Sequence, residues 1–371
     1  MEMRIFELTD RLILRGITRR AAGSYTKKFY EFGDIDLTIP LKASSAIECC
    51  PDRIICIDNK FWAIIENWRI SRNDQGGVIH FTGSTMEKWL ENRNILPTGL
   101  QPQDAPAGFD SVAGHSETVM KHYVRNNLVS PDNPGRAYKL LQIAPDQSRG
   151  LANDAYYGRF GSVHSALAKI GQKAQLGFEI TGDMKTSRFI FDVKQGVDRS
   201  ARQTVHRPVV LSIDRGSLSS FEYVHETGSS SNVFYCTRSG AQFEDEAFTQ
   251  TYFLDGIEQT GHNRRERHLD ISVDSDGDSY DEMESVARKD MEQYRETQSF
   301  EAEILKGINR PGKDFNVGDI VTLRDAASDL DIDRQIFELQ TSVSESGESY
   351  HAVFGSPALT KFELLNRKIG G

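Results

Sequence analysis

Residues 25–41 read YTKKFYEFGDIDLTIPL, and this stretch decides the fold of the N-terminal part of the chain. From residue 34 to residue 39, polar and aliphatic residues alternate, which is the period-two pattern of a strand with one buried face. Gly33 precedes the alternation and Pro40 closes it. The pattern predicts a β-strand that turns Ile35, Leu37 and Ile39 toward a core.

Strand signals continue beyond this stretch. KFWAIIENWRI (residues 60–70) and GGVIHFTG (residues 76–83) are two further strand-like runs, and the turn signal RNDQGG separates them. GSTMEKWLENRNI (residues 83–95) then predicts a helix. Ser84 could cap the amide three residues on and Glu87 could reach back, as in a capping box. Residues 1–96 are therefore predicted to be an all-β unit closed by one helix.

Length and composition favour a multidomain protein without a membrane segment. The chain has 371 residues, of which 38% are hydrophobic and 26% charged, so two to four domains with ordinary cores are expected. No run of 18 apolar residues is present, so no segment has the length that a membrane-spanning helix needs. The N-terminus starts acidic and mixes charges into its apolar stretch, unlike a secretory signal. We expect synthesis in a cytoplasm and no stable membrane insertion.

The net charge of −10 is unevenly spread. Residues 244–303 hold 18 acidic and 6 basic residues, so the rest of the chain is close to neutral. No basic stripe is present, which argues against sequence-independent binding of nucleic acid through its phosphates. The one basic cluster is Arg264, Arg265 and Arg267, and we interpret it as a solvated turn.

The four cysteines do not form a metal-binding pattern. They are Cys49, Cys50, Cys56 and Cys236, and CCPDRIIC lacks the paired CxxC spacing of zinc sites. In a chain made in a reducing cytoplasm, such cysteines are predicted to be packing thiols rather than disulfides.

Residues 97–200 have a mixed pattern that predicts an α+β unit. A loop rich in proline and glycine (residues 96–108) precedes an amphipathic helix, SETVMKHYVRNNL (residues 116–128), with Val119, Tyr123 and Val124 on its apolar face. A second helix is predicted in SVHSALAKIGQKAQ. LGFEITG and SRFIFDVKQG then form a predicted hairpin around DMKT.

The C-terminal part returns to β. Four strand candidates lie between residues 208 and 255, and an acidic loop then leads into a predicted helix that ends near Glu296. Four further strand candidates follow, among them NVGDIVTL (residues 316–323). Residues 358–371 are predicted to be a C-terminal tail. The predicted fold class is α+β, mostly β, in several domains.

No catalytic site is predicted. GHSET (residues 114–118) misses the nucleophile-elbow pattern because Thr118 stands where the second glycine belongs. Ser116 is interpreted as the first residue of a helix. His115 and His122 lack a recognisable carboxylate partner, so we interpret them as surface or interface residues. Carboxylate pairs of glycosidases have no sequence spacing by which they could be recognised.

No metal or cofactor site is predicted either. Asp274, Asp276 and Asp278 suggest calcium, but Ser279 and Ser285 occupy the positions where an EF-hand needs glycine and glutamate. These acids are interpreted as a solvated loop suited to the N-terminus of the following helix. No P-loop or Rossmann glycine pattern is present, so we expect no enzyme, no catalytic residues, no cofactor and no metal.

Several phrases in a fixed order resemble one family. The phrases are Gly33–Pro40, the glycine-led helix Gly83–Arg93, the group Asn126, Asn127, Pro134 and Arg136, FDVKQGVDR (Phe191–Arg199), the strand phrase Ser217–Tyr235, and VGDIVTL (Val317–Leu323). Through these phrases, from about residue 4 to residue 360, the chain resembles the tail-tip baseplate hub proteins of bacteriophages. This is the group of the N-terminal structural module of siphophage tail-associated proteins, which is similar to contractile-tail baseplate hubs.

The resemblance implies a structural virion protein at the tail tip. It implies a homotrimeric hub that connects the distal tail protein and the tape-measure protein to tail fibre or receptor-binding proteins. DNA would pass through the ring without specific binding, and acidic residues of 244–303 facing the lumen would prevent sticking. The chain stops at Gly371, so no wall-degrading extension is carried over.

The resemblance also implies a domain plan with two tube-like β-barrel domains. We expect the first barrel in residues 1–96 and an α+β domain in residues 97–200. The second barrel is expected in residues 205–262 together with 310–357, with an acidic helix-containing insert in residues 263–309.

Two other classes of function stay open. One is an enzyme that degrades cell-wall glycan or peptide, which would need a carboxylate pair or a metal site. The other is a module that binds cell-wall glycan or a receptor, whose sign would be exposed aromatic residues. The candidates are Phe221, Tyr223, Phe234 and Tyr235, and their alternation favours core and cross-strand positions instead.

Overall fold

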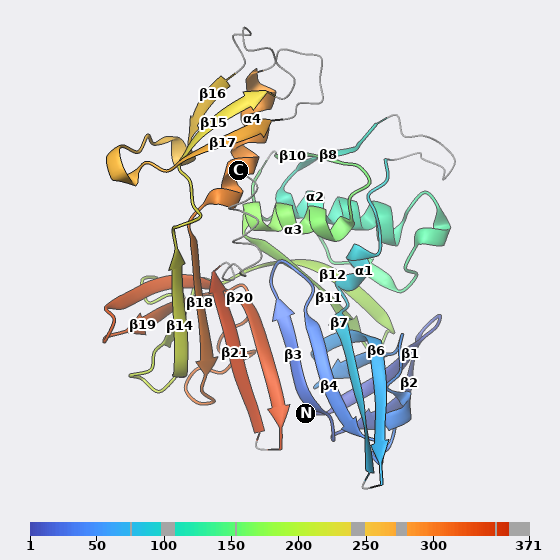
Figure 1. The fold of residues 1–371 in the computed structure, drawn as a ribbon. Helices are drawn as coiled ribbons and strands as arrows, with labels where there is room; N and C mark the ends of the chain where they lie inside the picture. Colours follow the sequence, from blue (N-terminus) through green and yellow to red (C-terminus); the bar gives the residue numbers. More distant parts are fainter. Residues whose placement is uncertain are drawn as a thin grey trace. The chain divides into compact units, whose positions relative to one another are not determined.

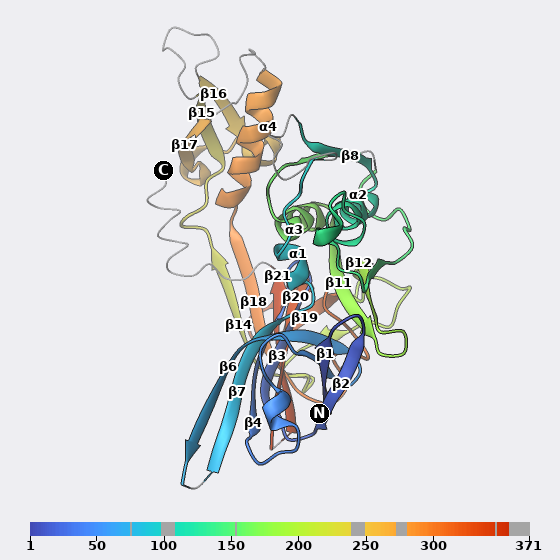
Figure 2. The same ribbon diagram turned by 90° about the vertical axis from the view of Figure 1, so that its right-hand side faces the viewer.

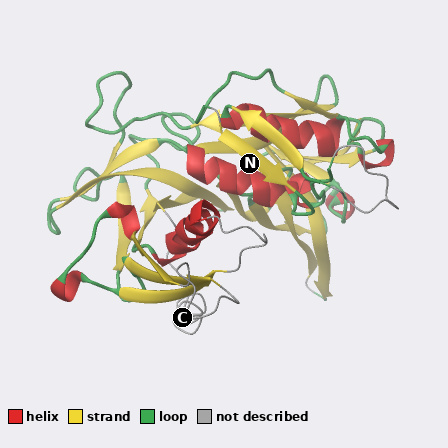
Figure 3. Ribbon diagram, turned by 90° about the horizontal axis from the view of Figure 1, so that it is seen from above, coloured by secondary structure: helices red, strands yellow, loops and turns green. Residues whose placement is uncertain are grey.

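The chain divides into two compact units of unequal size. The computed structural model describes residues 1–74, 76–97, 108–152, 154–238, 249–271, 280–345 and 347–355. The large unit is Met1–Phe221 with Ala302–Phe354, and the small unit is Glu222–Glu301 with Gly355–Gly371. Strands make up most of the regular structure (Figure 3). No described helix is long and apolar enough to cross a membrane.

The N-terminal strands form as the sequence predicts. They are β1 (Met3–Leu8), β2 (Leu12–Thr18), β3 (Ala22–Lys28), β4 (Asp34–Pro40), β5 (Ile54–Ile57), β6 (Phe61–Asn73) and β7 (Gly76–Thr85). In β4, Ile35, Leu37 and Ile39 are buried in a core with residues of β5, β6 and β7. Gly33 is required before β4 because a Cβ there would lie 1.8 Å from the Thr26 carbonyl oxygen.

The predicted capping box at residues 84–87 is wrong. Ser84 belongs to β7, and its hydroxyl donates to Glu66 at 2.9 Å. The helix α1 (Lys88–Glu91) is a single turn that starts later. The Glu87 carboxylate accepts a hydrogen bond from the Ile180 amide at 2.7 Å. Pairing of β7 with β4 and β6 continues through Ser84, so the strand extends over the expected helix start.

The second half adds its strands to the same sheet. These strands are β14 (Leu218–Glu226), β18 (Thr297–Ile304), β20 (Leu330–Ser344) and β21 (Gly347–Gly355), with β13 (Val210–Leu211) and β19 (Ile320–Asp325) as a side branch. The main path runs β14-β18-β21-β20-β3-β4-β7-β6-β5-β1-β2. In Figure 1 the red strands β20 and β21 stand beside the blue strands β3 and β4.

The α+β, mostly-β fold class is confirmed, but the two separate barrels are not found. Among the described strands no barrel closes, because β3 pairs antiparallel with β20 from Gly23↔Val343 to Lys28↔Glu338. The backbone hydrogen-bonding groups on one edge of β3, in the first half, are thus paired with β20, in the second half. The result is one open sheet that includes both halves.

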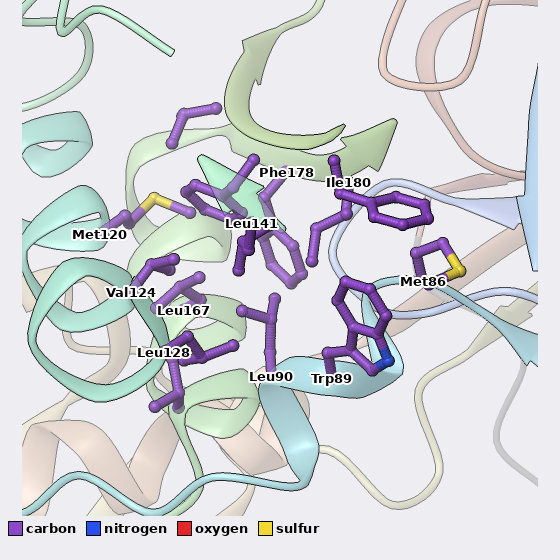
Figure 4. Close-up of a cluster of buried hydrophobic side chains, with 14 of the residues drawn as sticks. Met86, Trp89, Leu90, Met120, Val124, Leu128, Leu141, Leu167, Phe178 and Ile180 are labelled. Carbon is purple, nitrogen blue, oxygen red and sulfur yellow. The ribbon is translucent and has the colours of Figure 1, made fainter. Parts of the chain in front are cut away.

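A helical layer lies on part of this structure. It comprises β8 (Asp110–Gly114), α2 (Ser116–Val124), β9 (Leu141–Ile143), β10 (Asp154–Gly158), α3 (Val163–Ala174), β11 (Leu176–Asp183) and β12 (Arg188–Gln195). Both predicted helices and the predicted hairpin are present. Side chains from α1, α2, α3, β9 and β11 converge in one core, among them Trp89, Val124, Leu167 and Phe178 (Figure 4).

The small unit has a core of its own. Its sheet has the order β16-β15-β17, from Thr249–Phe253, Val233–Arg238 and Glu266–Ile271. Strand β15 is antiparallel to β16 and parallel to β17. Helix α4 (Tyr280–Met291) contributes Ala287 and Met291 to a cluster with Phe234 and Cys236. The predicted C-terminal tail lies outside the described residues.

Candidate functional site

One face of the central sheet is a broad polar surface. Alternation in β4 turns Asp36 away from the core, and Asp36 lies across from Ser24 on β3 and Thr82 on β7. Thr82 in turn pairs with Asn67 on β6. Ser24 pairs on its other side with Ser342 on β20. Residues directly opposite each other share a face, so this polar row continues from the first half of the chain into the second.

A second row on the same face repeats the pattern. Arg69 on β6 lies opposite His80 on β7, which lies opposite Thr38 on β4. On the other side of the first row, Gln340 of β20 lies opposite Thr26 on β3 and His351 on β21. Hydroxyl, amide, imidazole and charged groups therefore share this surface, and we call it the polar sheet face.

Several charged groups on the polar sheet face are paired, although Arg69 has no ion-pair partner among the described residues. His80 Nε2 lies 2.7 Å from Asp36 Oδ1, and His351 Nδ1 lies 3.0 Å from Glu303 Oε1. Lys28 lies 3.7 Å from Glu338. Most of the charge on the face is therefore compensated locally, and the face carries no basic stripe that could hold a run of phosphates.

The far half of β6 leaves an unpaired edge. Strand β5 pairs with β6 only from Phe61 to Ile64, and between residues 67 and 72 the described strands pair with β6 on the β7 side alone. Figure 2 shows β6 and β7 projecting together from the rest of the sheet. Trp68 and Ile70 stand on the core-side face here, opposite Phe81 and Ile79, yet they are 37% and 44% exposed.

The serine and histidines of GHSET and its helix have structural roles. Ser116 is the first residue of α2, and its hydroxyl accepts a hydrogen bond from the Leu151 amide at 3.1 Å. His122 does have a carboxylate partner, since its Nε2 lies 2.7 Å from Asp110 Oδ1. The sequence did not reveal this pair because Asp110 is on β8 and meets the helix only in the fold.

The basic cluster and the cysteines are part of the packing. Arg264 pairs with Glu258 at 2.9 Å and Arg265 with Glu296 at 3.1 Å, while the Arg267 guanidinium lies 4.1 Å from the Tyr294 ring centroid. The cluster is therefore engaged in side-chain contacts rather than forming a solvated turn. Three of the four cysteines (Cys49, Cys56 and Cys236) are buried unpaired thiols, as predicted, and Cys50 is unpaired and partly buried.

The candidate aromatic residues do not form an exposed platform. Phe234 is fully buried in the small core, and the Tyr235 hydroxyl donates to Glu266 at 2.9 Å. Tyr223 lies 6.4 Å from Phe300 between ring centroids. Asp274, Asp276 and Asp278, which the sequence analysis interpreted as a solvated loop, lie outside the described residues. Within the described ranges, no group of three or more His, Cys, Asp and Glu side chains is placed to hold a metal ion.

A buried ionic cluster escaped the sequence analysis. Glu117 and Lys121 stand one turn apart on α2 and are both fully buried. Lys121 Nζ lies 2.6 Å from Glu117, 3.1 Å from Asp192 and 2.8 Å from the Pro145 carbonyl oxygen. Arg149 Nε donates to Glu117 at 2.9 Å. Each charge is satisfied by the others, so the cluster holds α2, β12 and the loop before β10 together. The i,i+4 spacing was visible in the sequence, but its burial was not.

Asn127 and Arg136, from the Asn…Pro…Arg group of the sequence analysis, form a second set of buried contacts that stabilises the fold. Asn127 lies in a π-helical turn after α2 and is fully buried. Its Oδ1 accepts from the Leu96 amide at 3.1 Å and from Arg136 Nη2 at 3.3 Å, and its Nδ2 donates to the Tyr123 carbonyl oxygen at 2.9 Å. The same Arg136 nitrogen donates to the Asn94 carbonyl oxygen. This phrase therefore fixes the loop after α1 to the helical layer.

Three crystal structures share the fold of the chain. The 43 kDa tail protein of prophage MuSo2 from Shewanella oneidensis has a TM-score of 0.55 and 12% identity, covering 95% of this chain and 98% of that chain. The tail protein from Neisseria meningitidis MC58 has a TM-score of 0.55 and 13% identity, covering 95% and 96%. Prophage tail protein gp18 from Listeria monocytogenes EGD-e has a TM-score of 0.55 and 7% identity, covering 100% and 99%.

The fold is therefore that of prophage tail proteins, over nearly the whole length of each chain. No curated protein matches the sequence. The family of siphovirus ReqiPepy6 Gp37-like proteins matches residues 2–356, and the chain belongs to this family. The resemblance to siphophage tail proteins noted in the sequence is thereby confirmed.

Proposed function

We propose that the protein is a non-enzymatic structural subunit of the phage tail tip, and that three copies form a ring-shaped hub around the channel for DNA. Family membership and the shared tail-protein fold support a place in the tail. The observation that carries the proposal is the sheet. It is continuous through both halves of the chain, is polar on one face, and ends in strand edges that no described strand covers.

Pairing between copies would close the ring. The eight strands from β14 to β6 form an open wall with an end strand at one side and the free part of β6 at the other. Unpaired edges readily accept another strand, and a head-to-tail contact between unlike edges generates a ring when the rotation from copy to copy closes, here after three copies. Residues 67–72 of one copy would pair with β14 of the next. Trp68 and Ile70 would then be covered, which accounts for apolar side chains at an exposed edge.

The polar sheet face would form the channel wall. Apart from Arg69, its named groups are neutral or paired in place, as Asp36 is with His80. DNA binding without sequence preference relies on lysine and arginine contacts to phosphates, and a wall without such a stripe lets the duplex slide. We assign the wall to this face rather than to the acidic residues of 244–303, because the face extends through both halves of the large unit.

The hub would join two sets of partners. The distal tail protein and the tape-measure protein would meet it from the tail tube, and tail fibre or receptor-binding proteins would meet it from the host side. These partners come from the resemblance to tail-tip hubs. No catalytic arrangement among the described residues favours an enzyme over this role.

Immunogold electron microscopy of virions with antibody against this chain tests the proposal. We expect gold particles at the tail tip. Gold along the tube or on the capsid, or virions without label, would contradict a tail-tip hub.

A further inference from the structure

A large cleft opens on the face of the sheet opposite to the polar sheet face. Its volume is about 710 Å³, which is within the usual range for ligand-binding pockets. Tyr25 and Lys27 of β3 face it, as do Leu339 and Thr341 of β20, their neighbours across the β3–β20 pairing. The cleft therefore lies where the two halves of the sheet meet, and all of its lining residues belong to the large unit.

Three of the four acidic groups of the cleft are in ion pairs. Four carboxylates line it, namely Asp58, Glu179, Asp319 and Glu348. Glu179, Asp319 and Glu348 form ion pairs at 2.9–3.1 Å with Lys194, Arg199 and Lys306 respectively. Asp58 accepts a hydrogen bond at 2.7 Å from the uncharged backbone amide of Glu2. Among the described residues, Asp58 is therefore the one carboxylate of the cleft without a cationic partner.

Two lysines of the cleft have no ion-pair partner among the described residues. Lys27 on β3 and Lys60 before β6 are both exposed, and both line the cleft and a smaller cavity of about 80 Å³ that adjoins it. Among the described residues, neither ammonium group makes an ion pair or a side-chain hydrogen bond. Lys194, the third lysine, is held by Glu179 and Asp192. Two unpaired lysines outnumber the one unpaired carboxylate, that of Asp58, so the uncompensated charge of the cleft is positive on balance and the complementary ligand is an anion.

Aromatic rings form the apolar part of the cleft. The Tyr25 and Phe61 ring centroids are 4.6 Å apart. Thr341 of β20 lies between Tyr25 of β3 and Tyr350 of β21 in the sheet. Burial raises the pKa of Tyr350 to about 12, so its phenol stays neutral at neutral pH. The amides of Gln195 and Asn316 also line the cleft and could hydrogen-bond to peptide groups. A ligand with carboxylates, peptide groups and an apolar side chain matches this lining.

We propose that the cleft binds an acidic peptide segment of a partner protein, with its carboxylates at Lys27 and Lys60 and an apolar side chain against Tyr25 and Phe61. This inference rests on the proposed function, since a hub in a tail has proteins as its neighbours. The cleft lies on the opposite face of the sheet from the proposed channel wall, so binding there would leave the wall clear.

Fluorescence anisotropy at low ionic strength tests the inference with the full chain. The probe is a fluorescein-labelled peptide in which glutamate and leucine alternate, and the comparison peptide has glutamine in place of glutamate. We expect the glutamate peptide to bind about tenfold more tightly or better, since charge-assisted hydrogen bonds are about twice as strong as neutral ones. Raising the salt concentration should weaken this preference.

Charge reversal separates the cleft from the rest of the surface. The double variant Lys27→Glu/Lys60→Glu should lose the preference for the glutamate peptide, and Lys27→Gln/Lys60→Gln should reduce it. Lys42→Glu, at an exposed lysine outside the cleft, should retain it. Equal binding of both peptides by the wild type, or an unchanged preference in the double variant, would overturn the inference.

Two further measurements, binding of dextran sulfate and light scattering, distinguish the class of ligand and check that the variants still assemble. Binding of dextran sulfate but not of the glutamate peptide would also overturn the inference, because it would assign the cleft to an anionic glycan. Light scattering should give the double variant the same assembly mass as the wild type. If peptide binding fails while the ring still forms, only the cleft inference falls. If the double variant no longer assembles, the lysines belong to a contact between copies, which equally overturns it.

Discussion

At the residue scale, the buried ionic cluster around Glu117 makes stability depend on pH. Burial raises the pKa of this carboxyl, but hydrogen bonds from Arg149 and Lys121 outweigh that effect and lower the pKa to about 2. Because the pKa in the folded protein is below the ordinary value of 4.5, the contribution to stability is fully present above about pH 4.5. It is lost as the pH falls from 4.5 through about 2.

We predict that Glu117→Gln destabilises the protein by about 3 kcal/mol or more, because it removes the carboxylate shared by the buried Lys121 and the partly buried Arg149 and leaves them Asp192 alone as a counter-charge. Urea unfolding at neutral pH measures the loss. Glu345→Gln, at an exposed acid, is the matched control and should change stability by less than about 0.5 kcal/mol. Equal effects of the two substitutions would show that the cluster does not brace the fold.

The pKa of Glu87 is shifted in the opposite direction to that of Glu117. It is almost fully buried beside the Ile180 amide, and burial raises its pKa. An acid with a raised pKa in the folded state loses stability as the pH rises above its unfolded value of 4.5. We therefore predict that Glu87→Gln, which keeps the acceptor oxygen, melts at a higher temperature than the wild type at pH 7. The difference should shrink toward pH 4, and a difference that is constant across this range would contradict the prediction.

At the element scale, the free half of β6 is the feature on which assembly depends. Trp68 and Ile70 are apolar, exposed and next to an unpaired strand edge. We predict that Trp68→Lys/Ile70→Lys converts a trimer into monomers, because lysine on an edge strand opposes pairing with another chain. Light scattering coupled to size-exclusion chromatography measures the mass.

The control for this prediction is Ile47→Lys. Ile47 is 61% exposed and lies in a short turn between β4 and β5, so its replacement should leave the trimer intact. A trimer that persists in the β6 variant, or one that dissociates equally in the control, would remove the proposed role of this edge.

The sequence predicted elements whose pattern is local. The alternation at Ile35, Leu37 and Ile39 gave β4 within its observed bounds, and the apolar stripe at Val119 and Tyr123 gave α2. Such elements are predictable because each has one buried and one exposed face. The capping box failed at Ser84 because strand pairing with β4 overrode a local helix-start signal.

Features that depend on distant pairing were not predictable. The pairing of β3 with β20 joins residues that are more than 300 positions apart, and no local sequence pattern predicts which strands pair over that distance. That pairing turns two expected barrels into one open sheet. The same holds for the cleft and for the His122–Asp110 pair, whose members come together only when strands and helices from different segments pack.

At the scale of the whole molecule, the two units have separate cores. The small unit packs Phe234, Leu269, Met291 and their neighbours in a cluster that contains no residue of the large unit. We predict that Phe234→Ala destabilises the small unit by about 3–5 kcal/mol while the large unit keeps its protection. Hydrogen exchange measured by mass spectrometry should accelerate within residues 222–301. Acceleration across the central sheet would instead mean that the units unfold together.

The central claim concerns the polar sheet face and the ring it lines. Cryo-electron microscopy of the phage tail tip tests it most directly. We predict a threefold ring of this chain with Asp36, His80 and Gln340 facing the central channel and residues 67–72 of β6 paired with β14 of the neighbouring copy. A ring in which this face is turned outward or covered by another protein, or a tip without this chain, would contradict the claim.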